Sequence, residues 1–587
     1  EELKKQEVEL RHLWLEVFLE KTLLPELRQW LLLWGSKCKM YLKIKNILKV
    51  LILLNIIMYP IINAEARNAY IEALREVGKI APSAEEEVIK DYEEDVKPDV
   101  EFNMNDMKFL KLTLKDSLII ALNSNYDIRI AKMDPTIKEK DIKIAKSEFD
   151  PLLNVTGESE DSEEASNSGV LVGIGGGLTD FRRDTNSLNA SLETLIATGA
   201  TITLEFEVNQ QFVDPVSAFT LNNPVAESIV TAKITQPLLK NAGIFYNRSD
   251  IYIARNDKKR SILELKETAI EVINSTQKAY WELVKSIEEL RVRRKSLERA
   301  EDLLRKNKIQ VKVGTLAPIE LLVAEEGVTS QLEGVVVAEN DIKDREDDLK
   351  EIMNLSNNAL LFDVSIAPLD RASFKDRNIS LQESIETALE NRPEVFEQGL
   401  DIANARIKVM QKKNQLLPKL DFEAGMRYQG LAGNKGNAID RALSQDFQSE
   451  FYGIMFEVPL GNREARSNYS KAKLEERQTI FNTRKIRQEI VVEVRKAVRQ
   501  INTNAERIKA SKKAKELSQE RLVAEEKKFK VGRSTSLEVI RAQADLAVSE
   551  GRATNALVDY QISLGDLDAV LGTILENNNI IIDDKGI

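Results

Sequence analysis

Long stretches of the chain place apolar or small residues at intervals of three and four. From about 247 to 312 the sequence has no Pro and no Gly, and it carries such a seam at Ile262, Leu265, Ala269, Val272, Thr276, Ala279 and Leu283. This spacing is typical of coiled-coil helices. At ~1.5 Å per residue, one such helix extends about 100 Å, too long for a compact domain. Later seams lie at Ile490, Val494, Ala497, Ile501, Ala505 and Ile508, and at Ala553, Ala556, Tyr560, Leu564, Leu567 and Leu571.

Other stretches alternate between apolar and polar residues, which indicates strands. Phe422, Ala424, Met426 and Tyr428 alternate with Asp421, Glu423 and Arg427, and 450–458 repeats the pattern with Tyr452, Ile454, Phe456 and Val458. Their lengths approach the ~9–11 residues of a tilted membrane strand, with apolar side chains toward lipid and polar ones toward a lumen. A soluble hairpin with one face on a core is the alternative.

The first half has two additional alternating stretches, 187–194 and 201–208, joined by the short segment 196–200. A short turn between strands, with long loops on either side, fits a membrane barrel. Six strands per chain and an extracellular hairpin extension beside four strands are both consistent with this pattern.

Two internal matches indicate a duplication. Leu112-Thr113-Leu114 matches Ile379-Ser380-Leu381, which lies 267 residues later in the chain. Val313-Gly314 matches Val531-Gly532, which lies 218 residues later. We expect a first repeat over 67–361, with strands at about 152–236 and a helical hairpin at about 247–355. A linker over 362–378, a second repeat over 379–572 and a tail over 573–587 follow. The second repeat has strands at about 419–458 and a hairpin at about 462–571. Each repeat begins with a helix of about forty residues that ends at Pro151 or Pro418.

The N-terminal segment predicts export. Residues 40–66 place lysines before an apolar run over 50–62, followed by the small-residue site Ala64-Glu65-Ala66, which is the pattern of a signal peptide. The run is shorter than the roughly 20 residues of a spanning helix. Residues 1–39 precede this signal, so we interpret them as a spurious extension. They contain Cys38 and His12, the chain's single Cys and single His.

The remaining composition argues against enzyme chemistry and nucleic-acid binding. A mature chain without Cys and His has neither thiol nor imidazole catalysis, and scattered carboxylates do not define a hydrolase. We therefore predict no enzyme activity, no cofactor and no metal. The net charge of -11 is spread over interspersed charges, so nucleic acid is not an expected partner.

Two motifs have ordinary explanations. The Gly173–Gly177 stretch lacks the following helix of a dinucleotide loop and is interpreted as an outer loop. In the same loop we place an acidic cluster, interpreted as a solvated rim: Glu158, Glu160, Asp161, Glu163 and Glu164.

These features together resemble the TolC family of outer membrane efflux channels over about 100–572. The resemblance rests on the two helix starts, the helix-ending prolines, Gln236-Pro237-Leu238 and the two Val-Gly turns, all in duplicated order. It implies a mainly α fold with a membrane β-barrel, in which duplicated strand pairs and long coiled-coil hairpins assemble as a trimeric α/β barrel. The barrel would have twelve strands. The segments near 362–378 and 573–587 would form an equatorial collar.

The same resemblance implies function and partners. The chain would be a homotrimer in the outer membrane, in contact with its lipid and extending into the periplasm. It would export small molecules or proteins passively, joined to an inner-membrane pump through a periplasmic adaptor, in multidrug efflux or type I secretion. A periplasmic coiled coil without a pore is the alternative, although an adaptor has one helical hairpin instead of two.

Specific residues are assigned by this resemblance. The adaptor would contact the tips at 313–316 and 531–534, through Gly314, Thr315, Leu316, Gly532, Arg533 and Ser534. A periplasmic gate would include Glu320, Phe529, Ser534, Glu538 and Arg541. Phe529 replaces a Tyr and Ser534 replaces an Arg of the best-known members, so the hydrogen-bonded lock of those members is not expected. On the helix after Gly532, one stripe contains Ile540, Ala544 and Ala547, and another contains Glu538, Arg541 and Asp545. The charged stripe either lines the lumen, as the resemblance implies, or is a solvated outer face.

Overall fold

A computed structural model describes residues 109–166, 179–214, 221–355, 364–445 and 447–580. The predicted extension 1–39, the signal peptide 40–66 and the Gly173–Gly177 loop lie outside these residues. The chain divides into two compact units. One contains Leu153–Ile244 and Lys419–Glu457 and is built on a β-sheet, whereas the other is helical.

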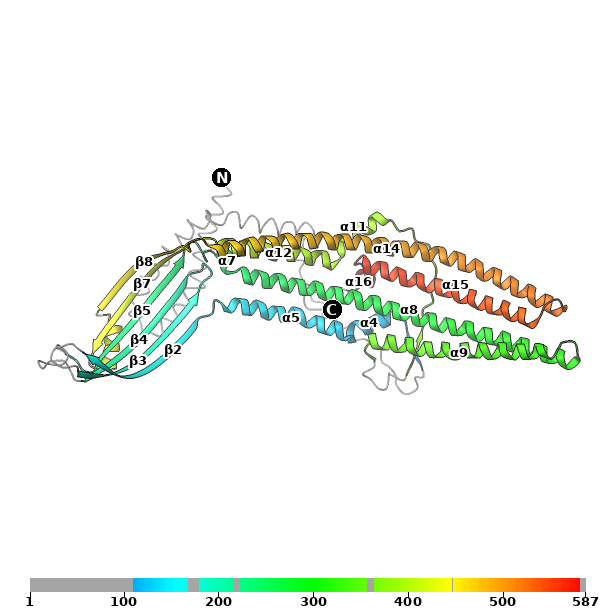
Figure 1. Ribbon diagram of the computed structural model, residues 1–587, viewed down its shortest axis with the longest axis horizontal. Coiled ribbons are helices and arrows are strands. Elements are labelled where there is room, and N and C mark those ends of the chain that lie inside the picture. Colours follow the sequence, from blue (N-terminus) through cyan, green and yellow to red (C-terminus); the bar gives the residue numbers. More distant parts are fainter. Residues whose placement is uncertain (1–108, 167–178, 215–220, 356–363, 446, 581–587) are drawn as a thin grey trace. The chain divides into compact units, whose positions relative to one another are not determined.

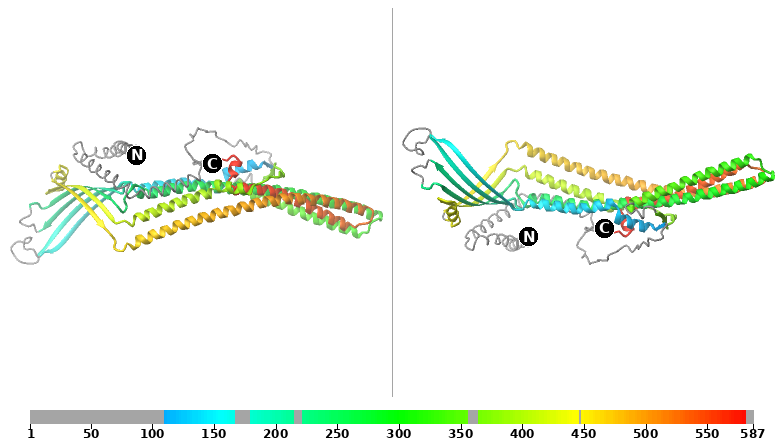
Figure 2. Two further views of the ribbon diagram at one scale, coloured as in Figure 1. Left: turned by 90° about the horizontal axis from the view of Figure 1, so that it is seen from above. Right: turned by 90° about the horizontal axis from the view of Figure 1, so that it is seen from below.

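The helical unit is built around two very long helices, each the first arm of a hairpin. Helix α8 (Ser249–Val313) has 65 residues and returns as α9 (Ile319–Ile352). Helix α14 (Arg463–Lys530) has 68 residues and returns as α15 (Ser536–Val570). Helix α15 packs against both α8 and α14, so the two hairpins lie side by side (Figures 1 and 2).

The predicted seams lie at the helix contacts. Leu265, Ala269, Val272, Thr276 and Leu283 of α8 are buried, as are Ile490, Val494, Ile501, Ala505 and Ile508 of α14. Ala556, Tyr560 and Leu567 of α15 join the second group in one apolar cluster. The spacing of three and four therefore identified the residues that hold the helices together.

Each repeat begins with two helices, so the prediction of one helix of about forty residues is wrong. The first repeat has α4 (Leu114–Ser124) and α5 (Tyr126–Ser147), and the second has α11 (Leu381–Asn391) and α12 (Pro393–Asn414). The breaks lie at Asn125 and Arg392, which are 267 residues apart and both extended, with ψ of 135° and 128°. Arg392 precedes a proline, which disfavours helical backbone. The Asn125 side chain instead accepts from the N–H groups of Asp127 and Ile128.

The helix starts that carry the duplication are N-caps. Thr113 accepts a hydrogen bond from the N–H of Asp116, whose carboxylate accepts one in return from the N–H of Thr113 at 3.0 Å. Ser380 likewise accepts from the N–H of Glu383. The matching sequences therefore recur because each hydroxyl satisfies a free backbone donor at a helix start.

A short parallel sheet links the two repeats. Strand β1 (Phe109–Leu112) precedes α4. It pairs with β6 (Ser365–Pro368), which lies within the predicted linker, so that Phe109 is opposite Ser365. The hydroxyl of Tyr280 in α8 donates to the Asp370 carboxylate at 2.8 Å. Asp370 also accepts from the N–H of Leu114 at 2.7 Å. Short α16 (Ile574–Asn577) also packs against α8 here.

The sheet unit contains six strands in the order β2-β3-β4-β5-β7-β8 among the described residues. These are β2 (Leu152–Ser166), β3 (Thr179–Leu195), β4 (Thr201–Asp214), β5 (Val225–Pro237), β7 (Lys419–Ala432) and β8 (Phe447–Glu457). The additional stretches are thus strands β3 and β4 inside the sheet, and not an extension beside it. The strands have 11 to 17 residues, which makes most of them longer than expected. The acidic cluster predicted in a loop lies along β2, which continues to Ser166.

Across β3, β4, β5, β7 and β8 the strand register gives the sheet one apolar and one polar face. One row across the apolar face joins Leu192, Leu204, Ala232 and Met426. A neighbouring row on the polar face joins Ser191, Glu205, Thr231 and Arg427. Because side chains alternate along a strand, the pattern read from single strands extends over the joined strands.

Helix α13 (Lys435–Leu443) covers part of the apolar face. Its Ala438 packs with Ala226 of β5 and Ala432 of β7. A Cβ atom at Gly430 would lie 2.0 Å from the carbonyl oxygen of Ala438, so this close approach requires glycine. The helix lies at the end of the sheet opposite the 196–200 turn, since it contacts the start of β5 and follows the end of β7. At the turn end, short α7 (Ile244–Asn247) follows the sheet.

Candidate functional site at the tips of two helical hairpins

The two hairpin tips have the same backbone structure. Gly314 and Gly532 have φ of 81° and 72°, in the left-handed region that glycine adopts without strain. The next residue closes each turn: Thr315 N–H donates to the carbonyl of Gln310, and Arg533 N–H donates to the carbonyl of Lys528, both at 2.9 Å. This bond belongs to the Schellman motif. The predicted tip residues Gly314, Thr315, Gly532 and Arg533 are exposed, and Leu316 and Ser534 are half-buried.

A buried polar contact joins the two tips. The carboxylate of Glu320, in the first turn of α9, accepts a 2.9 Å hydrogen bond from the N–H of Ser536, the first residue of α15. Asn307 of α8 donates to the Ser536 hydroxyl at 2.7 Å and, at 3.3 Å, to the carbonyl of Glu320. Asn307 and Ser536 are both 0% exposed. A carboxylate at a helix N-terminus also complements the helix dipole, so this contact fixes one hairpin against the other.

An apolar cluster lies next to this polar contact. It contains Leu303 of α8, Leu522 of α14 and Val539, Ala542 and Leu546 of α15. The half-buried Phe529, predicted as the gate aromatic, packs against this cluster, as does Ile540. The ring of Phe529 therefore has a packing role within the chain.

Ser534 makes a local contact. Its hydroxyl donates to the carboxylate of Glu525 at 2.5 Å. This hydrogen bond, together with Lys528 at 3.0 Å, lowers the pKa of Glu525 below its usual value. Ser534 thus holds the second tip to its own helix α14.

The charged stripe of α15 is exposed. Arg541 donates to Glu538 at 2.8 Å, and their side chains are 60% and 43% exposed. Asp545 accepts from Arg521 of α14 at 2.7 Å. In the stripe of apolar and small residues, Ala547 is buried, and Ile540 and Ala544 are half-buried. The carboxylates and guanidinium groups face water in the single chain, separately from the buried face that contains Val539 and Leu546.

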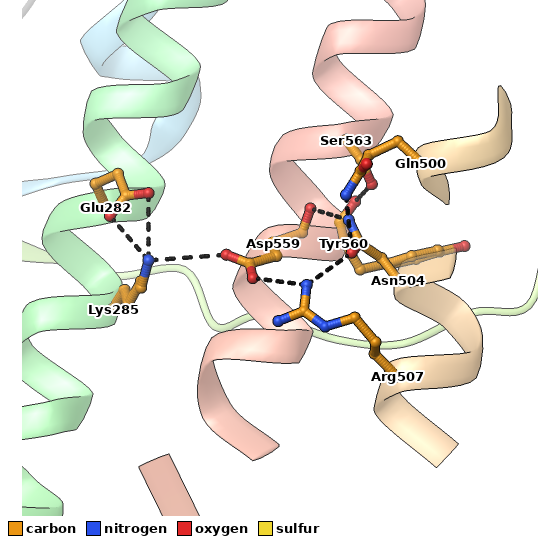
Figure 3. A network of polar contacts seen from close by, with 8 residues as sticks. All are labelled: Glu282, Lys285, Gln500, Asn504, Arg507, Asp559, Tyr560 and Ser563. Carbon is orange, nitrogen blue, oxygen red and sulfur yellow. Dashed lines mark hydrogen bonds and ion pairs between the residues drawn. The ribbon is translucent and has the colours of Figure 1, made fainter. Parts of the chain in front are cut away.

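A larger polar network fixes α15 between α8 and α14 (Figure 3). Asp559 of α15 lies 3.7 Å from Lys285 of α8 and 3.1 Å from Arg507 of α14. Asn504 of α14, which is buried, donates to the backbone carbonyl of Asp559 at 3.0 Å. The two hairpins are therefore joined here as well as at the tips.

The structure brings some of the predicted gate residues together. Phe529, Ser534, Glu538 and Arg541 all lie at the second tip, while Glu320 reaches that tip through Ser536. The prediction missed Asn307 and Ser536, which are ordinary polar residues in sequence. The 218-residue offset of the duplication is one signal that could have identified Asn307. It pairs Asn307 with Glu525, whose carboxylate bonds Ser534 at the second tip.

Two features are absent from the part of the chain that the structure describes. Among them, no helix is both long and apolar enough to cross a membrane. Nor do three or more His, Cys, Asp or Glu side chains gather there in a way that could hold a metal ion.

The chain therefore combines a sheet that has one apolar face with two long helical hairpins that pack side by side. The outer membrane efflux protein family matches residues 119–355 and 384–573. Because these segments make up more than half of the sequence, the chain belongs to the outer membrane efflux protein family. It is therefore a channel protein of the outer membrane and not an enzyme.

Solved structures of channels have the same fold. The Campylobacter jejuni CmeC outer membrane channel has a TM-score of 0.56 at 15% identity, over 78% of this chain and 86% of that one. The outer membrane protein VceC of Vibrio cholerae has a TM-score of 0.56 at 13% identity, over 78% and 96%. The open state of the Neisseria gonorrhoeae MtrE channel has a TM-score of 0.54 at 16% identity, over 79% and 89%. No curated protein sequence matches the chain.

Proposed function

We propose that the chain is one protomer of a homotrimeric channel for passive export across the periplasm and outer membrane. Small molecules or proteins would pass through it, and an inner-membrane pump joined by a periplasmic adaptor would supply the energy. Family membership supports the channel role. The observation that carries the trimer is a pair of open edges in each unit.

The helical unit has apolar side chains on its edge helices. Helix α5 packs on α8 at one edge, and α14 lies at the other. One face of α5 carries apolar residues at heptad spacing that are more than half exposed: Ile130, Met133, Ile137 and Ile144. On α14, Leu474 and Phe481 are similarly exposed, seven residues apart. A heptad seam that no other described residue covers favours closure against a further copy of the chain.

The sheet unit is open in the same sense. Strands β2 and β8 are its edges, and Tyr452, Ile454 and Phe456 of β8 are exposed on the apolar face. Unpaired strand edges are not tolerated in a bilayer, because their backbone donors and acceptors find no water there. Pairing between copies would satisfy both edges. With six strands from each chain, the closed barrel would have more strands than the twelve that the resemblance implied.

The tips support the remaining parts of the proposal. Exposed Gly314, Thr315, Gly532 and Arg533, with Leu316 and Ser534 beside them, are the proposed adaptor contacts. Glu320, Phe529, Ser534, Glu538 and Arg541 are the proposed gate. Exposed Glu538 and Arg541 are available to line a lumen, whereas the buried contact between Glu320 and Ser536 would determine how far the tips separate.

Assembly and conduction of the purified protein test this function. In detergent we expect a trimer by native mass spectrometry, and in planar bilayers we expect stable channels. Ile137→Glu places a charge in the α5 seam and should produce monomers. Thr136→Glu adds the same charge at an exposed position beside the seam and should leave the trimer intact.

Other outcomes would contradict the proposal. A folded monomer from the parent chain excludes the trimer. A stable trimer without conductance supports instead a coiled-coil protein of the periplasm that forms no pore. Adaptor coupling is tested separately, by crosslinking from Thr315 and Arg533 in cells.

A further inference from the structure

Polar pairs at successive levels hold α12 against α8. Near one end, Gln411 donates to the Ser249 hydroxyl at 2.6 Å. Further along are Asn404 with Asp257 at 2.9 Å and Arg260 with Asp401 at 2.8 Å. In each pair a donor meets an acceptor, as buried or half-buried polar groups require.

The next level of this interface has an acceptor without a donor. Glu397 lies on the buried face of α12, one turn before Asp401, and is 7% exposed. Its Oε1 atom is buried and has no hydrogen-bond partner. The charges around it are largely negative: Glu264 and Glu267 from α8, and Glu394 from α12.

The nearby cations already have partners. Arg260 donates to Asp401 and, at 3.0 Å, to Glu264. Arg392 bonds Glu394 at 3.1 Å and also Glu493 of α14. Three carboxylates therefore face Glu397, and both guanidinium groups are shared with other acids. An isolated buried carboxylate is costly unless it is paired or protonated.

We propose that Glu397 is a proton-dependent latch between α8 and α12. When the carboxyl is protonated, it is uncharged and its hydroxyl supplies the donor that this level of the interface lacks. When the proton leaves, the buried carboxylate faces Glu264, Glu267 and Glu394, and α12 separates from α8 more readily. The latch does not depend on the proposed export function.

The titration follows from burial and like charge. Burial, and then Glu267 and Glu264, raise the pKa of Glu397 from 4.5 to about 7, while Arg260 opposes the shift. The native state therefore keeps a proton that the opened state releases. The stabilisation is complete below pH 4.5 and is lost as pH rises toward 7. Within this window the opening constant increases by up to about tenfold per pH unit.

A polar groove gives protons access to this interface. It has a volume of about 670 Å³ between α8, α12 and α14, and Arg260 and Asp401 lie in its lining. Lys408, Glu475 and Lys485 are further charged residues of the groove. Arg260, which bonds Glu264, lies in this groove, so water and the pH outside the protein reach the interface next to Glu397.

Hydrogen exchange of the assembled protein in detergent tests the latch. Peptides covering 393–414 are measured between pH 5 and 8 and corrected for intrinsic exchange, with 536–550 as the internal reference. In the parent chain, opening of 393–414 should increase at least tenfold relative to the reference. Glu397→Gln keeps the shape, removes the charge and should abolish this increase. Glu390→Gln, at an exposed carboxylate of α11, should retain it.

A second variant checks the cause. Glu267→Gln removes one negative charge that faces Glu397. Because like-charge repulsion from Glu267 raises the pKa of Glu397, this variant should move the midpoint of the transition to lower pH. A shift to higher pH would mean that the Glu267 charge favours deprotonation. Exchange of 393–414 that is independent of pH in the parent chain overturns the proposal. So does a Glu397→Gln variant that keeps the parent's pH dependence.

Discussion

The carboxylate of Glu320 accepts a 2.9 Å hydrogen bond from the backbone N–H of Ser536, which joins the start of α9 to the start of α15. The two residues are 216 positions apart in sequence. Ser536 is fully buried, and its backbone N–H is bonded by this carboxylate. This hydrogen bond is therefore a specific link between the two repeats.

Removing the Glu320 carboxylate should loosen the start of α15. A hydrogen bond to a charged group contributes about 1.5–3 kcal/mol. We expect Glu320→Ala to accelerate amide exchange in 535–540 by about 10- to 100-fold, and Glu320→Gln to have a smaller effect because it keeps an acceptor. Glu326→Ala, at an exposed carboxylate of the same helix, should change nothing. Unchanged exchange in Glu320→Ala would show that the link carries no stability.

The Asn307 side chain should act together with Glu320. It contacts both Ser536 and Glu320, so the two substitutions should not be additive. We expect Asn307→Ala to cost about 1–3 kcal/mol at the tips, since it leaves a buried hydroxyl with fewer partners. A double-mutant cycle with Glu320→Ala, read by exchange in 535–540, measures the coupling. Strict additivity would mean that the two contacts act independently.

Charge at positions 538 and 541 should determine ion preference if the proposed gate lines the lumen. In one chain Glu538 and Arg541 form an exposed pair at 2.8 Å, so their charges partly cancel. We expect weak selectivity in the parent channel. Arg541→Ala should make the channel prefer cations, and Glu538→Ala should shift it toward anions.

Reversal potentials across a planar bilayer under a salt gradient measure this preference. Glu526→Ala, at an exposed position of α14, provides a charge-matched control for Glu538→Ala. If neither variant differs from the parent in reversal potential or conductance, the pair lies outside the lumen.

Two glycines near α13 should respond in opposite ways to alanine. A Cβ at Gly430 would meet backbone atoms of Ala438 and Ala442 at 2.0 and 2.5 Å, so Gly430→Ala should displace α13 from the sheet. At Gly436, within α13, the nearest atom would be 3.6 Å away, and alanine should stabilise the helix by roughly 0.5–1 kcal/mol. Limited proteolysis of 433–446 measures both effects. Equal protection of the two variants would show that α13 does not need the close contact.

Local patterns in the sequence predicted many individual elements. Gly314 and Gly532 marked both turns because the left-handed backbone there favours glycine. Thr113 and Ser380 marked helix starts because a hydroxyl at that position satisfies a backbone donor. The break at Asn125 was missed, because no proline follows it and its cap depends on a side-chain conformation that the sequence does not specify.

Among the tip residues, the duplication pointed to both turns, since the two copies keep Val-Gly at one offset, and the family resemblance pointed to Glu320 and Glu538. It gave no role to Asn307 and Ser536. Their function depends on the packing of α8 against α15, which places them 2.7 Å apart although 229 residues separate them in sequence.

The sequence by itself determined the two long hairpins, the faces of the strands and the duplication, because helix and strand periodicity depend on neighbours within a few positions. Only the tertiary structure decided that β3 and β4 lie inside a six-stranded sheet, that Glu320 bonds Ser536, and that Glu397 has no donor. Each of these depends on which distant segments become adjacent. Alternation and spacing give the face on which a side chain lies, but the partner on that face is set by packing of the whole chain.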